Sequence, residues 1–245
     1  MSFTNIKSVM LMSYLASGIN AFAATEDYDV KRDLMVEEVQ QMVTMTESFT
    51  GTSALDEQVV EAMKAVPRHE FVTAEFRDNA YDNTALPIDF YQTISQPYIV
   101  ALMTQLAKVS PDSVVLEVGT GSGYQAAVLA EIVNHVYSIE ILEPLGREAE
   151  ARLQRLGYNN ITVKIGDGYH GWLEHAPFDA IIVTAAAPHI PEQLIEQLKP
   201  GGRLVIPVGE DHLSQSLKVI IKGVDGKIEE REVLPVAFVP LTGEH

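Results

Sequence analysis

The sequence predicts an α/β protein built on a doubly wound, mainly parallel sheet, with a helical cap before it and antiparallel strands after it. Three observations lead to this fold class. Short β-branched runs alternate with helical segments from residue 113 onward, which is typical of parallel sheets. Apolar residues before that point recur at helical spacing. A glycine-rich turn, V-L-E-V-G-T-G-S-G-Y at residues 115–124, joins the first β-branched run to the next helical segment.

Composition limits the classes of protein that the chain can represent. Its 245 residues are 47% hydrophobic and 21% charged, which is enough to bury the core of a large domain. We expect one domain over residues 25–245, with the cap at 30–110 and the sheet at 111–245. A formal charge of −17 opposes binding to nucleic-acid phosphates, so no nucleic-acid partner is expected. The absence of cysteine excludes disulfides and thiolate chemistry.

The first 24 residues precede the predicted domain and have some features of an export signal. Lys7 precedes a mostly apolar run, and A-F-A-A at residues 21–24 fits a signal-peptidase site that would cleave after Ala23. Export to the periplasm and a simple N-terminal extension both remain open. The run is too short to span a membrane and no other segment approaches that length, so we expect no stable membrane association.

Three amphipathic segments make up the predicted cap, at residues 33–43, 55–66 and 97–107. Asp56 is a candidate N-cap of the second helix, which should end before Pro67.

Five strands and three helices are expected in the sheet region. The strands cover residues 113–119, 135–141, 161–167, 178–185 and 202–209, and the helices cover 124–133, 144–156 and 190–198. Two further strands, at 217–223 and 229–241, are joined by the turn V-D-G-K without a helix. They should therefore add to a sheet edge in antiparallel fashion.

The glycine turn lies where the first strand ends and a helix begins, which is the edge where such sheets bind ligands. Gly119, Gly121 and Gly123 let the backbone approach a ligand closely. Glu140, at the end of the second strand, can accept hydrogen bonds from both ribose hydroxyls. Taken alone, Glu140 would fit a solvated strand end better, but with the glycines at this spacing we favour ribose binding.

The spacing of the glycines distinguishes a dinucleotide from a nucleoside cofactor without phosphate. A dinucleotide site would usually read G-x-G-x-x-G, whereas this chain reads G-x-G-x-G with Glu117 just before it. An acidic side chain there disfavours a pyrophosphate and suits an amino or sulfonium group, as in S-adenosylmethionine. Asp167, in G-D-G after the third strand, could accept from an adenine amino group or could belong to an ordinary turn.

With these motifs the sequence resembles a known family, the protein-L-isoaspartate O-methyltransferases, which methylate isoaspartyl residues in damaged proteins. The similarity extends over about residues 33–243. Its motifs here are V-P-R-H-E-F-V, Q-T-I-S-Q-P-Y-I-V-A, the glycine turn, G-D-G, F-D-A-I-I-V-T-A-A-A-P, L-K-P-G-G-R-L-V-I-P-V-G and F-V-P-L-T. Several are general to methyltransferases, and T-I-S-Q-P carries most of the assignment.

The resemblance implies a Rossmann-like methyltransferase fold, S-adenosyl-L-methionine as cofactor, and Ser95 as the active-site serine. It also implies a set of cofactor-binding residues: Pro97, Tyr98, Glu117, Gly119, Gly121, Gly123, Glu140, Asp167, Gly168 and Thr242. An alternative role for Ser95 is a helix cap, because Pro97 fits a first helical turn.

The implied reaction requires little of the protein's own acid–base chemistry. The substrate carboxylate, with a reference pKa of about 4, is already ionised at neutral pH and needs no general base. Positioning can therefore supply most of the catalysis. The seven histidines show no metal-binding spacing, so no metal is expected. We expect damaged proteins and peptides as partners, a monomer, and a cytoplasmic location.

The chain also departs from the family. Where the family commonly reads L-P-I-G-Y-G-Q-T-I-S, this sequence has Asp89 and Tyr91 in place of glycines, and Ala237 stands where bacterial relatives often have arginine. These changes could shift substrate selectivity. Two other hypotheses therefore stay open: methyl transfer to another acceptor, and a non-catalytic binding protein on the same fold.

Overall fold

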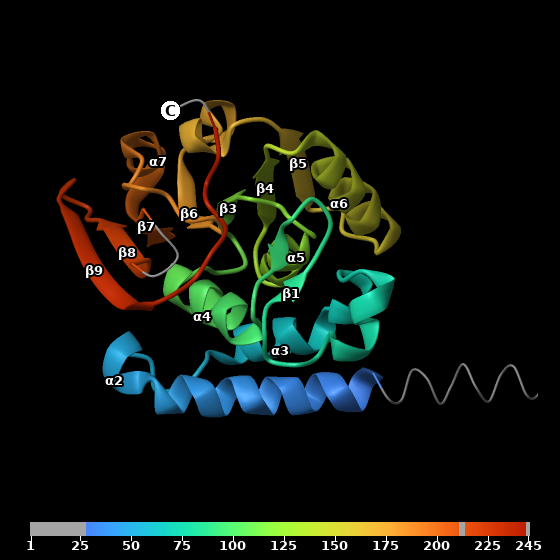
Figure 1. The fold of residues 1–245 in the computed structure, drawn as a ribbon. Coiled ribbons are helices and arrows are strands. Elements are labelled where there is room, and N and C mark those ends of the chain that lie inside the picture. The colour runs from blue at the N-terminus through green and yellow to red at the C-terminus, as the bar shows by residue number, and fades with distance from the viewer. Residues whose placement is uncertain (1–27, 211–213, 244–245) are drawn as a thin grey trace, which may run out of the picture.

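The computed structural model describes residues 28–210 and 214–243, and it confirms a doubly wound, mainly parallel sheet with antiparallel strands at its C-terminal end (Figure 1). The candidate export signal lies outside the described residues. Seven strands form the sheet in the order β5-β4-β3-β6-β7-β8-β9. They are β3 Val114–Val118, β4 His135–Glu140, β5 Ile161–Ile165, β6 Phe178–Val183, β7 Leu198–Val208, β8 Ser216–Lys222 and β9 Ile228–Pro235.

The central strands are buried on both faces, which is why they read as nearly continuous apolar runs. Side chains alternate along β3, so Val115 belongs to one hydrophobic cluster and Leu116 to the other. The first cluster also contains residues of the helix at 28–45 and of three further helices, α3 (Glu57–Ala65), α4 (Pro97–Ala107) and α5 (Tyr124–Ala130). The cap and the sheet therefore share one core.

Each predicted helix is present, although several begin or end two to five residues away from the predicted bounds. The helices cover residues 28–45, α2 Glu47–Thr50, α3 Glu57–Ala65, α4 Pro97–Ala107, α5 Tyr124–Ala130, α6 Glu143–Arg155 and α7 Glu192–Glu196. The expected bounds of α4 are confirmed, with Pro97 in its first turn and Lys108 ending it in the left-handed conformation (φ 52°). Asp56 occupies the N-cap position of α3, but its side chain makes no cap bond and instead lies 3.3 Å from the Lys108 ammonium group.

Some expectations were wrong in detail. The cap also contains the hairpin of β1 Leu86–Pro87 and β2 Thr93–Ile94, and the short 3-10 helices η1 Arg68–Glu70 and η2 Ala74–Asn79. The last parallel strand begins at Leu198 rather than at 202, because the helix before it ends early. The final strand ends at Pro235, and the residues after it leave the sheet as a tail.

Strand order reverses between β3 and β6, because the chain proceeds from β3 to β4 and β5 on one side and from β6 to β7 on the other. The pairs β3–β4, β4–β5, β3–β6 and β6–β7 are parallel, so their carboxyl ends lie along one edge. Such a switch point is where open sheets of this kind bind ligands.

No helix in the described part of the chain is both long and apolar enough to cross a membrane.

Candidate active site

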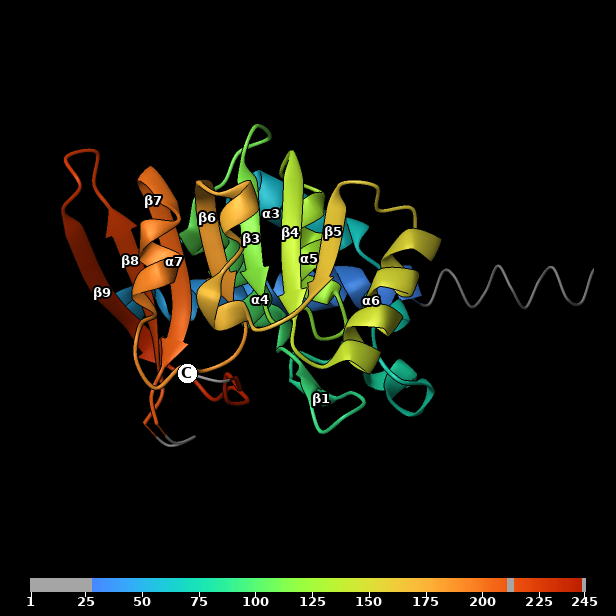
Figure 2. The same cartoon turned by 90° about the horizontal axis from the view of Figure 1, so that it is seen from above.

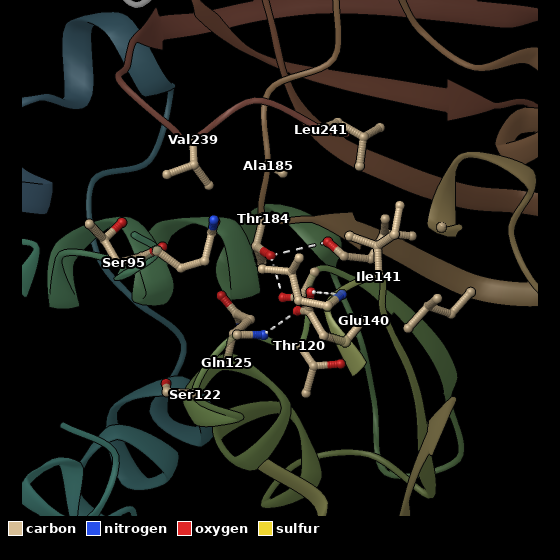
Figure 3. A pocket seen from close by; sticks show the side chains of 18 of the residues that line it. Ser95, Thr120, Ser122, Gln125, Glu140, Ile141, Thr184, Ala185, Val239 and Leu241 are labelled. Atoms are coloured by element: carbon tan, nitrogen blue, oxygen red, sulfur yellow. Dashed lines mark hydrogen bonds between the residues drawn. The ribbon is translucent and has the colours of Figure 1, made fainter. Parts of the chain in front are cut away.

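A pocket lies at the switch point, between the hairpin strand, the glycine turn and the tail (Figure 3). Its lining comes from residues 92–95, 118–122, 139–142, 184–185 and 239–242, with Val100, Tyr124, Gln125 and Gly168 completing the walls. A cavity therefore lies at the edge of the sheet where the glycine turn predicts that a ligand binds.

The glycine turn packs too tightly for side chains at its first position. Gly119 has φ 97°, and a Cβ there would collide with the Thr184 hydroxyl, which donates to the Gly119 carbonyl at 2.5 Å. Gly121 has φ 54° and faces the pocket. Both positions need the left-handed conformation that glycine adopts without strain. Gly123 caps α5 with φ 88° and lies outside the pocket lining, and a Cβ there would press against the Leu153 side chain.

The Glu140 carboxylate is fixed beside this turn. One oxygen accepts from the backbone N–H of Gly121 at 2.9 Å and the other from that of Leu142 at 3.0 Å. Each carboxylate oxygen can accept more than one hydrogen bond. The side chain is buried, yet it lines the pocket, so its remaining acceptor positions suit two adjacent hydroxyls.

Glu117 lies beneath the turn and does not line the pocket. It is fully buried and accepts a short hydrogen bond from the Ser138 hydroxyl, which in turn lies 2.6 Å from the hydroxyl of the pocket residue Thr120. Burial raises the pKa of Glu117 to about 8, and the nearby charge of Glu140 adds to the rise. Glu117 therefore supports the turn through Ser138 and Thr120.

Replacing Glu117 with glutamine should change how stability depends on pH. The folded protein holds a proton on Glu117 that the unfolded chain releases at about pH 4.5. This contribution to stability is complete at low pH and is lost as pH rises toward about 8. Urea unfolding midpoints should thus fall between about pH 5 and about pH 8 more steeply in the unaltered protein than in Glu117→Gln. Equal slopes for the two proteins would contradict a protonated Glu117.

Ser95 lies across the pocket from Glu140 (Figure 3). The segment that carries it is held by Arg68, which is completely buried and donates to the carbonyls of Ser95 and Ala80, both at 2.8 Å. The Arg68 guanidinium also lies 4.7 Å from the ring centre of Tyr124, itself a pocket residue. Burial lowers the pKa of Arg68 to about 10, so the group stays charged at neutral pH.

The helix-cap interpretation of Ser95 is wrong. Gln96 occupies the N-cap of α4, and no hydrogen bond of the Ser95 hydroxyl is found among the residues that the structure describes. The exposed N–H of Tyr98 is satisfied from elsewhere in the chain, by the side-chain oxygen of Asn83 at 3.0 Å. The Ser95 hydroxyl, in a half-buried side chain, is therefore available to a ligand.

The tail closes the pocket on the side opposite the glycine turn. Ala186, just after β6, pairs with it through two backbone hydrogen bonds: Ala186 N–H to the Val239 carbonyl at 2.8 Å, and Leu241 N–H to the Ala186 carbonyl at 2.7 Å. Thr242 then lines the pocket, and Gly243 lies so close to the Asp167 carboxylate that a Cβ there would clash.

The structure places some of the predicted site residues in the lining of the pocket and others outside it. Those that line the pocket are Ser95, Gly119, Gly121, Glu140, Gly168 and Thr242. Those that do not are Pro97, Tyr98, Glu117, Gly123 and Asp167. The Tyr98 hydroxyl points away, to the Thr46 hydroxyl at 2.7 Å, and the Asp167 carboxylate accepts from the Tyr169 N–H at 2.9 Å.

Sequence reasoning missed several residues of the site. Arg68 stood in a quoted motif, but no spacing rule identifies a buried arginine that binds carbonyls. Gln125 lines the pocket and its side-chain oxygen is buried without a partner among the described residues, while its amide nitrogen donates to Thr104 at 2.9 Å. A polar residue on the apolar face of α5 was the available signal.

The charge of the pocket restricts its ligand. Glu140 is the only charged residue among those that line it, and no lysine or arginine of the described chain does so. A pyrophosphate would therefore find no cationic partner, whereas a ribose and a positively charged group fit the lining. A doubly wound sheet with such a pocket at its switch point defines the class of Rossmann-like, S-adenosylmethionine-dependent methyltransferases.

Comparison with known proteins gives the family. The family model of protein-L-isoaspartate(D-aspartate) O-methyltransferase matches residues 39–245. Protein-L-isoaspartate O-methyltransferase 2 of Syntrophobacter fumaroxidans is 56% identical over 237 residues, which cover 97% of this chain and 96% of that protein. The protein of the same name from a Polaromonas species is 61% identical over 86% of this chain and 100% of its own length. This chain belongs to the protein-L-isoaspartate O-methyltransferase family.

Solved structures agree with this assignment. A protein-L-isoaspartate O-methyltransferase matches with a TM-score of 0.72 and 28% identity over 85% of this chain, which spans 66% of that protein. A Plasmodium falciparum relative, solved in complex with S-adenosyl-L-homocysteine, matches with a TM-score of 0.69 and 25% identity over 86% of this chain and 98% of its own.

Proposed function

We propose that this chain transfers a methyl group from S-adenosylmethionine to the free carboxylate of L-isoaspartyl residues in damaged proteins, and so initiates their repair. The observation that carries the proposal is the placement of Ser95, from the T-I-S-Q-P segment, across one pocket from Glu140. Family membership supports the same activity.

The pocket residues divide into two groups in this proposal. Glu140 would accept hydrogen bonds from both ribose hydroxyls while Gly119 and Gly121 let the backbone approach. Gly168 and Thr242 would enclose the rest of the cofactor, with Asp167 oriented behind them by the Tyr169 N–H. S-Adenosyl-L-homocysteine, which the Plasmodium relative holds, has the same ribose and adenine.

Positioning can supply most of the catalysis. The sulfonium cofactor supplies an electrophilic methyl group, and the substrate carboxylate is already ionised at neutral pH. Ser95 would hold that carboxylate by donating its hydroxyl, in line with the methyl group. The tail, anchored by Ala186, would exclude water from this gap.

Radiolabelled methyl transfer tests the proposal against its alternatives. Two peptides of one sequence, one with isoaspartate and one with aspartate, are incubated with the protein and labelled S-adenosylmethionine. We expect base-labile label on the isoaspartyl peptide alone. Label on neither peptide but on another acceptor would indicate a different methyltransferase, and cofactor binding without any transfer would indicate a binding protein.

We further propose that the protein acts in the cytoplasm as a monomer and binds neither nucleic acid nor membranes stably. S-Adenosylmethionine is made in the cytosol, and the charge of −17 opposes binding to nucleic acid. N-terminal sequencing of the protein from its native host tests the location, and gel filtration tests the oligomeric state. A mature chain that begins at Ala24 would show export instead.

A further inference from the structure

The hairpin tip, residues 89–91, joins β1 to β2 through a four-residue turn. The Gln92 N–H donates to the Asp89 carbonyl at 3.2 Å, and the two central residues, Phe90 and Tyr91, have φ of 59° and 58°. Positive φ at both central positions is the pattern of a type I′ turn, which usually carries Asn-Gly or another pair with glycine. Two bulky aromatic residues in succession are strained there.

The Phe90 and Tyr91 side chains are not buried deeply enough in the protein to compensate for this strain. Tyr91 is 101% exposed and Phe90 is 43% exposed, so both rings present apolar surface to solvent. Strained residues persist where the surrounding structure holds them, and they concentrate at functional sites. The rings therefore need an explanation other than the stability of the hairpin.

The hairpin tip adjoins the segment that lines the active-site pocket. Gln92, the residue after Tyr91, lines the pocket, and the chain continues from it through β2 to Ser95, which lines the pocket as well. Figure 2 shows the hairpin projecting from the edge of the sheet where the parallel strands end. A polypeptide whose carboxylate reaches the Ser95 hydroxyl therefore has neighbouring residues close to this turn.

The charges around the hairpin tip favour a cation. Asp89 is an exposed carboxylate two residues before Tyr91, and its charge also acts on Arg152. Aromatic faces beside a carboxylate attract lysine and arginine side chains through cation–π and charge interactions.

We propose that the hairpin tip contacts the residue next to the isoaspartate in the substrate polypeptide and selects for lysine or arginine at that position. This specificity site rests on the proposed function. Tyr91 supplies the exposed ring and Asp89 the negative charge, and the strained turn holds both in place beside the pocket.

Substituting Tyr91→Gly tests the proposal through substrate preference. Two isoaspartyl peptides are compared that differ in one flanking residue, lysine or glutamate. The unaltered protein should show a KM about fivefold lower for the lysine peptide, and Tyr91→Gly should reduce this preference to less than about twofold. The melting temperature should not fall, because glycine relieves the strained φ.

Lys108→Gly is a matched control. Lys108 also has a left-handed φ of 52°, but it ends α4 away from the pocket, and its exposed ion pair with Asp56 contributes little stability. This variant should keep the full preference for the lysine peptide. An unchanged preference in Tyr91→Gly, or a marked fall in its melting temperature, would overturn the proposal. A failure of the unaltered protein to methylate either peptide would instead contradict the proposed function.

Discussion

Replacing Glu140 with alanine is expected to reduce the affinity for S-adenosylhomocysteine about 100-fold without unfolding the protein. The carboxylate is anchored by the backbone N–H groups of Gly121 and Leu142, and its free acceptor positions face the pocket. Each hydrogen bond to a charged group contributes about 1.5–3 kcal/mol, so losing two ribose contacts is sufficient for a loss of at least this size. Isothermal titration calorimetry measures it directly.

Two controls separate the ribose contact from loss of charge. Glu143→Ala removes a carboxylate that is 68% exposed in the first turn of α6, three residues further along the chain, and it should leave affinity unchanged. Glu140→Gln keeps one acceptor oxygen and should give an intermediate affinity. NAD should not compete for the site, because no cation of the described chain lines it. Unchanged affinity in Glu140→Ala would remove this residue from the cofactor site.

Substituting Ser95→Ala should reduce kcat for an isoaspartyl peptide by about tenfold to 100-fold, while affinity for the cofactor changes by less than about threefold. The Ser95 hydroxyl has no partner among the described residues, so its removal leaves the fold intact. The lost hydrogen bond belongs to the reacting geometry, and its effect should therefore appear in the rate. Single-turnover kinetics and calorimetry on the same preparation measure both quantities.

Thermal melts complete the test of Ser95. Ser110→Ala removes an exposed hydroxyl that lies 3.2 Å from the Ser113 hydroxyl, far from the pocket lining, and should leave the rate unchanged. A Ser95→Ala protein that melts at a lower temperature but transfers methyl groups at the full rate would return Ser95 to a structural role.

The sequence predicted those parts of the fold that depend on local periodicity. Helix α4 was predicted to the residue, because Pro97 fixes its start and a strongly apolar run continues to Ala107. The parallel strands followed from β-branched runs between helices. The tail was predicted as strand because V-A-F-V-P-L is apolar and β-prone, but its partner is Ala186 beside the pocket, a contact that no local pattern encodes.

The site was predicted less completely, for a similar reason. Glycines and a carboxylate at the strand ends are visible in one sequence, and Gly119, Gly121 and Glu140 do line the pocket. The alternation of strand side chains could have shown that Glu117 points to the α5 face, but not that it would be fully buried. The role of Arg68 depends on the carbonyls of residues 80, 84 and 95 meeting around it, which requires the fold.

A crystal structure of the protein with S-adenosylhomocysteine and an isoaspartyl peptide tests the central claim most directly. The account predicts both ribose hydroxyls on the Glu140 carboxylate, the peptide carboxylate within hydrogen-bonding distance of the Ser95 hydroxyl, and the tail covering both. A ribose bound away from Glu140, or a peptide carboxylate that does not reach Ser95, would contradict it.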